Sequence, residues 1–226
     1  MATLPRPKGR FSLVLLDEGE YYIDDNSAVY FPPTETNPQR LDSASRPFQI
    51  KGRLYVCSLS VVFEPQDLST PIYRFPYKTT LRVGTLRSHP DSVVISSSQV
   101  IEMRQNGKNT PYHFREFSAE HLFELKYATS ADTFLANLST LQQLSRSQDR
   151  FEVDIQVREM IAARERQLVF DPSWLVSLSE RPLFDQLAAR VQPLVEMPGR
   201  VVVTGSRVYF QPLHRVDASP VERWAL

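Results

Sequence analysis

The chain resembles itself at an offset of 147 residues. Residues 52–65 and 199–212 are identical at six of fourteen positions: Gly52/Gly199, Arg53/Arg200, Val56/Val203, Val61/Val208, Phe63/Phe210 and Pro65/Pro212. In each copy, apolar residues alternate on both sides of a short polar turn, which is the pattern of a β-hairpin. The closing proline lacks a backbone N–H and ends strand pairing. The repeat indicates that one β-module begins twice, although two unrelated hairpins of common residue types are the alternative interpretation.

Short runs rich in Val, Ile, Tyr and Phe continue through the first two thirds of the chain. The expected strands are Phe11–Leu16, Tyr21–Ile23, Phe48–Cys57, Ser60–Glu64, Ile72–Val83, Ser92–Arg104 and Tyr112–Tyr127. Turn residues separate them, and Asn106-Gly107 is the strongest hairpin signal because both residues tolerate positive φ. Residues 31–47 are rich in proline and polar residues and are expected to form a loop. Strands at this near-regular spacing predict a β-sandwich or small barrel.

A helical pattern follows the last of these runs. Apolar residues recur at spacings of three and four from Phe134 to Leu144, and Ser130 is placed to cap the first turn. The predicted fold class is therefore α+β and mainly β, an antiparallel β-module closed by one C-terminal helix. That outline resembles the pleckstrin-homology (PH) superfold and its GRAM relatives.

The remaining third of the chain predicts a connector and a second module. Residues from Arg150 to about Gln192 are charged and helical in character, with a break at Asp171-Pro172-Ser173 and a second expected helix from Arg181 to Arg190. We therefore expect a PH/GRAM-like domain at 8–147, a helical linker at 148–192 and the truncated start of a second PH-like domain at 193–226. A PH-like fold needs roughly 100 residues, so this second copy is expected to be incomplete.

Composition excludes several classes of protein. The 26 Lys and Arg residues balance 26 Asp and Glu residues, whereas a nucleic-acid module normally carries a basic excess. The single cysteine, Cys57, allows no internal disulfide and no multi-cysteine zinc site, which favours a reducing, cytoplasmic setting. No apolar run approaches the roughly 20 residues that span a bilayer, so any membrane association is expected to be peripheral, at the plasma membrane or endomembranes.

Catalytic signals are lacking. The sequence has no nucleophile elbow, no P-loop, no His-Glu-x-x-His and no paired-cysteine motif. Its four histidines are scattered, and no residue near Cys57 marks that thiol as activated. We therefore expect no catalytic residue, no metal site and no cofactor, and predict that the protein is not an enzyme.

The balanced charge is distributed unevenly. Residues 46–108 hold nine basic and four acidic groups, whereas residues 17–42 hold seven acidic groups and one basic group. PH domains that bind phosphoinositides place several cations on the first strands, where they converge on phosphates. The candidate lipid-binding residues are Lys51, Arg53, Arg74, Lys78 and Arg82, with Lys51 and Arg53 sharing one strand face and the other three expected on a neighbouring strand. The alternative is that all five are ordinary solvated strand residues.

Several motifs together resemble a known family. They are Arg10–Leu16, Glu20–Tyr22, the hairpin Lys51–Pro65, and the run from Pro193 to Leu213. These segments resemble the N-terminal part of FAN-like proteins, the BEACH and WD-repeat family named for the factor associated with neutral sphingomyelinase activation. The resemblance implies a PH/GRAM-like domain, a helical connector and a second PH-like domain that precedes a BEACH domain. The chain shows no BEACH or WD-repeat segment, which suggests a short isoform or fragment.

Two functions are consistent with these observations. The first is a non-catalytic adaptor and membrane-targeting region that binds anionic phospholipid. The resemblance implies a role for it in signalling from the tumour-necrosis-factor receptor to neutral sphingomyelinase, and in membrane or vesicle recruitment. The alternative is a protein-interaction scaffold that packs on a BEACH domain or another partner without binding lipid.

Overall fold

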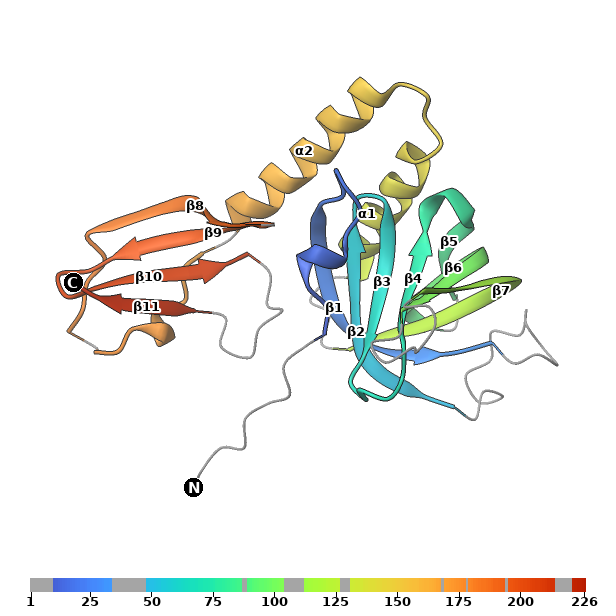
Figure 1. Ribbon diagram of the computed structural model, residues 1–226, viewed down its shortest axis with the longest axis horizontal. Helices are drawn as coiled ribbons and strands as arrows, with labels where there is room; N and C mark the ends of the chain where they lie inside the picture. Colours follow the sequence, from blue (N-terminus) through green and yellow to red (C-terminus); the bar gives the residue numbers. More distant parts are fainter. Residues whose placement is uncertain are drawn as a thin grey trace. The chain divides into compact units, whose positions relative to one another are not determined.

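The computed structural model describes residues 10–33, 48–86, 89–103, 112–126, 131–167, 169–177, 179–193, 195–213 and 221–226. The chain divides into two compact units, Asp17–Val157 and a second unit that joins Met1–Leu16 to Arg158–Leu226. The first unit contains a seven-stranded sheet and the second a four-stranded sheet (Figure 1).

The sheet of the first unit closes into a barrel. Its strands are β1 (Tyr22–Phe31), β2 (Ile50–Cys57), β3 (Ser60–Pro65), β4 (Ile72–Pro76), β5 (Thr80–Leu86), β6 (His89–Met103) and β7 (Tyr112–Lys126). They lie in the antiparallel order β4-β3-β2-β1-β7-β6-β5, and β4 also pairs with β6. This extra pairing closes a ring of six strands, and we call the whole sheet the barrel.

Strand β6 closes the ring because its two halves pair with different strands. Its first half pairs with β5, from Leu86 opposite His89 to Thr80 opposite Ser97, and its second half pairs with β4. The register shifts between Ser97 and Gln99, where the Ser97 hydroxyl donates to the Gln99 carbonyl at 2.7 Å. A bulge of this kind bends a strand and re-aims its side chains.

Large aromatic side chains fill the barrel. Tyr30 stacks on Phe123 with 4.7 Å between ring centroids and contacts Phe63 at 5.3 Å, and Phe75 meets Phe123 edge to face. All four side chains are at most 3% exposed. Together they make this core the most aromatic part of the molecule.

Helix α1 (Ala131–Leu144) lies against β5 and confirms the expected C-terminal helix. Its residues at spacings of three and four, Phe134, Leu138 and Leu141, are buried. Near its end, Gln142 donates a side-chain hydrogen bond to the Thr80 carbonyl at 3.0 Å, which satisfies a polar group at the edge of β5.

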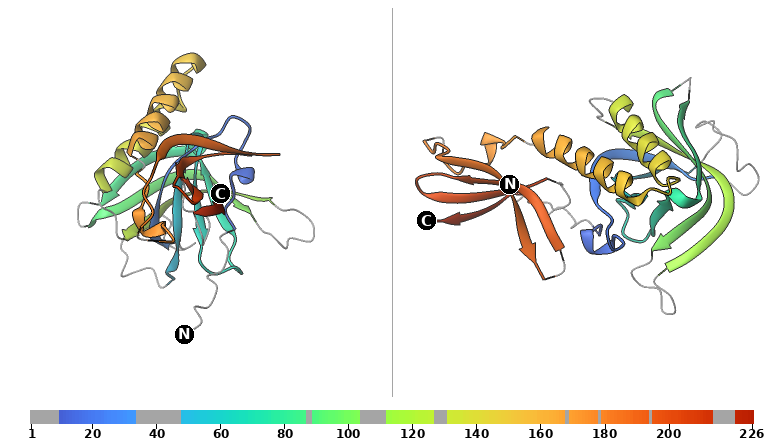
Figure 2. Two further views of the ribbon diagram at one scale, coloured as in Figure 1. Left: turned by 90° about the vertical axis from the view of Figure 1, so that its left-hand side faces the viewer. Right: turned by 90° about the horizontal axis from the view of Figure 1, so that it is seen from above.

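The second unit contains a four-stranded antiparallel sheet, which we call the second sheet. Its strands are β8 (Phe184–Gln192), β9 (Val195–Val203), β10 (Arg207–Pro212) and β11 (Glu222–Ala225), in the order β11-β10-β9-β8. They form a single twisted layer (Figure 2). One face of it is covered by Phe170, Trp174, Leu175 and Val221, which pack on Val202 and Tyr209.

The second sheet repeats the pairing registers of β1–β4, apart from a bulge near the start of β1. The matched partners are Ala28, Gly52 and Pro65 against Ala188, Gly199 and Pro212, and Val56, Val61 and Phe75 against Val203, Val208 and Trp224. The repeat therefore covers four strands and not only one hairpin. Two unrelated hairpins would not share the pairing register of four strands.

The two repeated positions require glycine for the same structural reason. A Cβ atom on Gly52 would lie 2.6 Å from the Phe63 ring, and one on Gly199 would lie 2.6 Å from the Phe210 ring. In both copies the nearest atom to the added Cβ would be a backbone carbonyl oxygen of the facing strand, that of Glu64 or Gln211, and the phenylalanine ring comes next, so both contacts require glycine.

Four sequence predictions were wrong. The run Ile72–Val83 is not one strand, because the 3-10 turn Tyr77–Thr79 divides it into β4 and β5. Residues 11–16 are not a strand, because Leu13–Leu15 form a 3-10 turn capped by the Ser12 hydroxyl. The helix expected from Arg181 to Arg190 is instead strand β8, since pairing with β9 overrides the helical propensity of its Leu-Ala-Ala run. Arg74 lies on β4, which pairs with β3 and β6 and not with β2. Ser130 and Asn106-Gly107 lie outside the described residues.

Helix α2 (Arg150–Gln167) begins where the sequence predicts it. The carboxylate of Asp149 accepts hydrogen bonds from the backbone N–H groups of Phe151 and Glu152 at 3.0 and 3.1 Å, which caps the helix. After it, Asp171 caps the 3-10 turn Pro172–Trp174, so the expected break at Asp171-Pro172 is confirmed.

Candidate functional site

The five cationic candidates lie in different environments. Lys51 is exposed at the start of β2, and among the described residues it forms no ion pair. It lines a groove of about 350 Å³ together with Gln49, Gln66, Asp67 and Thr70. The groove lies where β2 begins and β3 ends, and Lys51 is the cation of the five that is best placed for an external ligand.

Arg53 is held by the barrel. Its guanidinium forms a close ion pair with Asp25, whose side chain is only 3% exposed. Burial alone would lower the pKa of Arg53, but the attraction of Asp25 outweighs it and raises the pKa. The positive charge is therefore neutralised on the strand where the sequence predicted a phosphate ligand.

Arg74 is buried and fully engaged. Its guanidinium donates to both oxygens of Asp17 at 2.9 and 2.6 Å, to Glu20 at 2.5 Å and to the Ser60 hydroxyl at 2.9 Å. The hydrogen bonds from Arg74 hold the pKa of the Asp17 carboxyl below its usual value. Arg74 is 7% exposed and serves the interior of the unit, so it is not available to a membrane surface.

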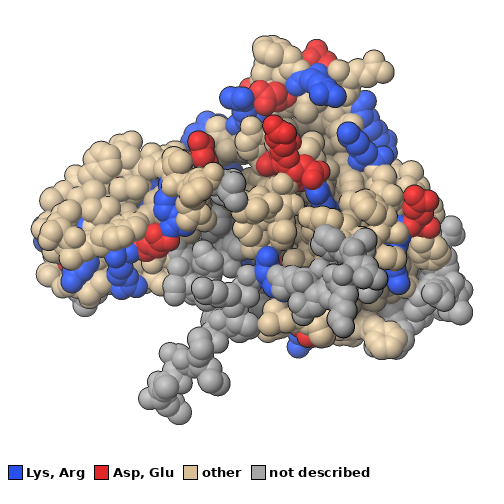
Figure 3. Space-filling model, viewed as in Figure 1, with Lys and Arg blue, Asp and Glu red and all other residues tan. Residues whose placement is uncertain are grey.

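The remaining two candidates are on the surface but apart. Lys78, in the turn after β4, is exposed, and its charge acts on Asp17. Arg82 on β5 forms an exposed ion pair with Glu120 at 3.0 Å. On the face that Figure 3 shows, basic and acidic atoms are interspersed and form no single large basic area. The five cations do not converge on one site.

A cavity at one end of the barrel was not predicted from the sequence. It has a volume of about 510 Å³, within the range of small-molecule sites, and lies where β1 and β6 end and β4 and β7 begin. We call it the barrel-mouth cavity. Its apolar walls are Tyr30, Pro32, Pro33, Tyr73, Val100 and Phe117, and its polar groups are Glu102, Arg115, Glu116 and His121.

The walls of this cavity are held in place. The Tyr30 hydroxyl is 2.7 Å from Nδ1 of His121, and the rings of Tyr30 and Tyr73 meet edge to face with centroids 5.5 Å apart. The Glu102 carboxylate is 3% exposed and lies 3.0 Å from Nε of Arg115, which is 60% exposed. No sequence signal joins these residues, because they come from four strands.

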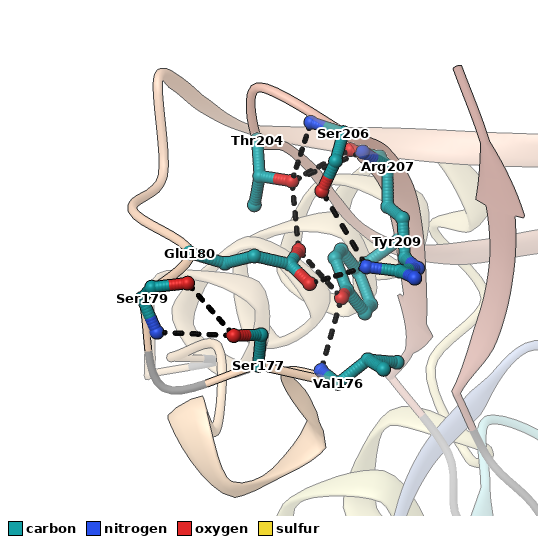
Figure 4. A network of polar contacts seen from close by, with 8 residues as sticks. All are labelled: Val176, Ser177, Ser179, Glu180, Thr204, Ser206, Arg207 and Tyr209. Atoms are coloured by element: carbon teal, nitrogen blue, oxygen red, sulfur yellow. Dashed lines mark hydrogen bonds and ion pairs between the residues drawn. The ribbon is translucent and has the colours of Figure 1, made fainter.

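Glu180 is the centre of a polar network in the second unit (Figure 4). Its carboxylate accepts hydrogen bonds from Thr204 at 2.8 Å, Arg207 at 2.6 Å and Tyr209 at 2.7 Å. Burial would raise the pKa of Glu180, but the hydrogen bonds from these three donors outweigh it and hold the pKa below its usual value. Because all its contacts come from the same unit, this network fastens the segment before β8 to the sheet.

An apolar row lies on the other face of the second sheet. It consists of Phe184, Val203, Val208 and Trp224, which are direct cross-strand neighbours. Phe184 is 51% and Trp224 48% exposed, whereas the barrel counterparts of the last three residues, Val56, Val61 and Phe75, are at most 1% exposed. We refer to these four residues as the apolar row.

Groups able to do chemistry are few among the described residues. Cys57 is buried, and burial together with the nearby charge of Glu20 raises the pKa of its thiol well above the usual value, so it is a poor nucleophile. Within the same residues, no group of three or more His, Cys, Asp or Glu side chains is arranged to hold a metal ion.

Comparison with protein families identifies the first unit. The family model described as the FAN protein N-terminal PH domain matches residues 2–154. The chain belongs to this family. The match includes all seven barrel strands and helix α1, so the FAN PH barrel is the structure that the resemblance in the sequence implies.

Membership of the FAN PH family supports a PH-type adaptor or membrane-targeting region, and PH domains are generally non-catalytic. None of the described helices combines the length and the apolar composition needed to cross a membrane. The candidate surfaces of this FAN-family chain are the Lys51 groove, the barrel-mouth cavity and the apolar row.

Proposed function

We propose that this chain is a non-catalytic adaptor region of a FAN-like protein and acts mainly by holding protein partners. Two of the five candidate lipid ligands, Arg53 and Arg74, form ion pairs inside their own unit, so fewer cations are available to bind a phosphoinositide headgroup. The scaffold interpretation is favoured instead. The signalling role that the family implies, between the tumour-necrosis-factor receptor and neutral sphingomyelinase, belongs to this proposal.

The exposed apolar row carries the proposal. Two large apolar side chains, Phe184 and Trp224, are half exposed at the ends of a row whose counterpart in the barrel is fully buried. Leaving such a side chain in water in place of a packed interface forgoes about 1.5–3 kcal/mol. A surface of this kind favours a partner, and the family resemblance points to a BEACH domain, preceded by strands that complete a second PH-like barrel.

The domain boundaries follow from the same reasoning. We propose that the second PH-like module begins before β8, since β8 pairs with β9 in the register of β1 with β2. That start is earlier than the residue 193 expected from the sequence, and the helical linker is correspondingly shorter. It is centred on α2.

The test uses the two tryptophans, Trp174 and Trp224, which both lie in the second unit. Co-expression and titration with the family's BEACH region is expected to shift tryptophan emission to shorter wavelength as Trp224 becomes buried. Phe184→Asp should weaken binding at least tenfold. Val191→Asp is the matched control, because Val191 is 73% exposed on the same strand but at a position of opposite side-chain direction. Equal loss in both variants, or no binding, would count against the scaffold proposal.

Membrane recruitment is a second candidate function, supported by Lys51. This exposed lysine lines the groove at the end of the barrel where β2 begins. Co-sedimentation with vesicles that contain anionic phospholipid or phosphoinositide should depend on ionic strength and fall with Lys51→Glu. Lys78→Glu and Arg82→Glu serve as comparisons because those residues lie elsewhere. Binding that does not respond to lipid charge would contradict recruitment through Lys51.

A further inference from the structure

We propose that the barrel-mouth cavity binds a quaternary ammonium group, as found in choline and in phosphocholine headgroups. The walls of the cavity support this site independently of the proposed adaptor function. It concerns the first unit alone, and all ten lining residues belong to Asp17–Val157.

The shape of the cavity suits a small ligand group. Its volume of about 510 Å³ lies within the range of about 300–1,000 Å³ typical of small-molecule sites. It opens at the end of the barrel that also carries the Lys51 groove, since β2 begins and β6 ends there.

The aromatic walls favour a cation. Tyr30, Tyr73 and Phe117 line the cavity, but Tyr30 is 2% exposed and its ring stacks on Phe123 and His121. The rings that could offer an electron-rich face to an alkylated ammonium group are therefore Tyr73 and Phe117. Tyr30 is held by stacking on Phe123 at 4.7 Å and by its hydroxyl contact with His121 at 2.7 Å. Tyr30 in turn meets the ring of Tyr73 edge to face, so Tyr73 is positioned before a ligand arrives, which reduces the entropy lost on binding.

The charged side chains of the lining are also consistent with a cationic group. The lining includes two carboxylates, Glu102 and Glu116, and one guanidinium, Arg115, which already pairs with Glu102. Glu102 is 3% exposed and lies deep, while Arg115 is 60% exposed. A cation against the aromatic walls would share the Glu102 carboxylate with Arg115, and a phosphate attached to it would reach the exposed guanidinium of Arg115.

The observations fit a quaternary ammonium group better than a metal ion or an anion. A bare cation such as Ca²⁺ needs six to eight oxygen ligands, whereas most of this lining is carbon. An anion would meet two carboxylates for one guanidinium. A bulky, weakly hydrated cation satisfies both the apolar walls and the negative charge.

The first experiment titrates the whole chain with choline and with 3,3-dimethylbutan-1-ol, which has the same shape without the charge. Amide chemical shifts near Tyr73 and Phe117 are followed by NMR. Choline is expected to bind saturably, and the neutral analogue at least about fivefold more weakly. Equal affinity for the two compounds, or no saturation by choline, would overturn the proposal.

Two phenylalanines on β7 provide a matched pair of variants. Phe117 lines the cavity and is 43% exposed, while Phe114 is 58% exposed and does not line it. Phe117→Ala should weaken choline binding by about fivefold or more, and Phe114→Ala should leave it unchanged. Since both residues are already partly exposed, both variants should fold, which far-UV circular dichroism checks. Glu102→Gln should also weaken choline binding while leaving that of the neutral analogue unchanged.

The source of the ammonium group is distinguished with vesicles. Co-sedimentation with phosphatidylcholine vesicles, lost in Phe117→Ala and retained in Lys51→Glu, would assign the cavity to a lipid headgroup. Saturable binding of choline or phosphocholine without co-sedimentation would assign it to a soluble ligand. Vesicle binding that Phe117→Ala does not change, together with no binding of choline, would refute the cavity as a quaternary ammonium site and leave the Lys51 groove untouched.

Discussion

Strands β1–β4 and β8–β11 share one plan but differ in what covers one of their faces. In both sheets, a glycine on the second strand lies under a phenylalanine of the third strand, and an arginine next to that glycine pairs with an aspartate of the first strand. The barrel encloses its inner row completely, while the apolar row of the second sheet stays half exposed. Local pairing rules therefore produce the sheet, and the remaining strands decide whether its inner face is buried.

The two units also fasten their leading segments in a similar way. Glu20 accepts a hydrogen bond from Ser60 at 2.7 Å, and Glu180 accepts one from Arg207 at 2.6 Å, and Ser60 and Arg207 are equivalent positions of the repeat. In the barrel the positive charge comes from Arg74 on β4, whereas in the second sheet it comes from Arg207 itself. The buried glutamate has been kept and its cationic partner comes from a different strand.

The largest expected contrast between the two sheets concerns the paired phenylalanines. Phe63→Ala should destabilise the barrel by about 3–5 kcal/mol, because it leaves a cavity among Tyr30 and Phe123. Phe210 is also buried, at 3% exposed, but one side of its ring is covered by the guanidinium of Arg190 and not by other aromatic rings. Phe210→Ala should therefore cost less, below about 3 kcal/mol, because a long arginine side chain can move into the space. Urea unfolding followed by far-UV circular dichroism for the barrel, and by tryptophan emission for the second sheet, measures both. Equal costs would contradict the difference in enclosure.

The second contrast concerns the repeated ion pairs. Arg53→Met leaves Asp25, 3% exposed, as an unpaired buried carboxylate, and should cost about 3 kcal/mol or more. Arg200→Met leaves Asp185, 37% exposed, in contact with water, and should cost at most about 1 kcal/mol. Adding Asp25→Asn to Arg53→Met should recover part of the loss. The same unfolding measurements give both free energies. A larger loss of stability for Arg200→Met than for Arg53→Met would contradict this prediction.

A smaller effect, similar in both sheets, is expected at the repeated glycines. Gly52→Ala and Gly199→Ala each place a methyl group against a phenylalanine ring and a backbone carbonyl and should cost about 1–3 kcal/mol. Gly84→Ala and Gly205→Ala are the matched controls, because a Cβ at either position meets no atom within 4 Å. Hydrogen exchange of the backbone amides in each hairpin measures the loss of stability separately for the barrel and for the second sheet. A neutral result at Gly52 or Gly199 would show that the phenylalanine rings move aside.

The smallest effect is a pH dependence confined to the second unit. A carboxyl whose pKa is lowered by folding contributes stability above its unfolded pKa of about 4.3, and that stability is lost as the pH falls through the folded value. Glu180→Gln should therefore lower the unfolding midpoint followed by tryptophan emission at neutral pH, and the difference from the unchanged chain should shrink towards about pH 3. A difference that stays constant with pH would assign the effect of Glu180 to shape and not to charge.

Much of the fold could be predicted from local patterns. The strands β2, β3, β6 and β7 and helix α1 were recognisable because half-buried strands and helices carry periods of two and of 3.6 residues. The repeat was recognisable because the Gly and Phe positions are required by direct contact across one hairpin. Strand β8 was not, since its run of Leu187, Ala188 and Ala189 fits a helix equally well until β9 pairs with it.

The candidate site was predicted less completely. Lys51 and Arg53 were predicted as lipid ligands because cations on the first strands of a PH domain are expected to contact phosphate; of the two, Lys51 is exposed and Arg53 is paired with Asp25. The loss of Arg74 to the interior could not be foreseen, since its partners Asp17 and Glu20 lie 57 and 54 residues away in the chain. The barrel-mouth cavity was missed for the same reason: its walls extend from Tyr30 to His121 and share no motif.

The sequence by itself determined the β-rich class, the helix that follows the barrel strands and the presence of a repeated hairpin, because these depend on neighbours close in the chain or directly across a turn. Only the tertiary structure decided that β6 pairs with both β4 and β5, that Arg53 and Arg74 are neutralised, and that one of two like sheets leaves its inner face exposed. Those outcomes depend on burial and on charges brought together from distant segments, and the free energy of both is set by the folded surroundings and not by local sequence.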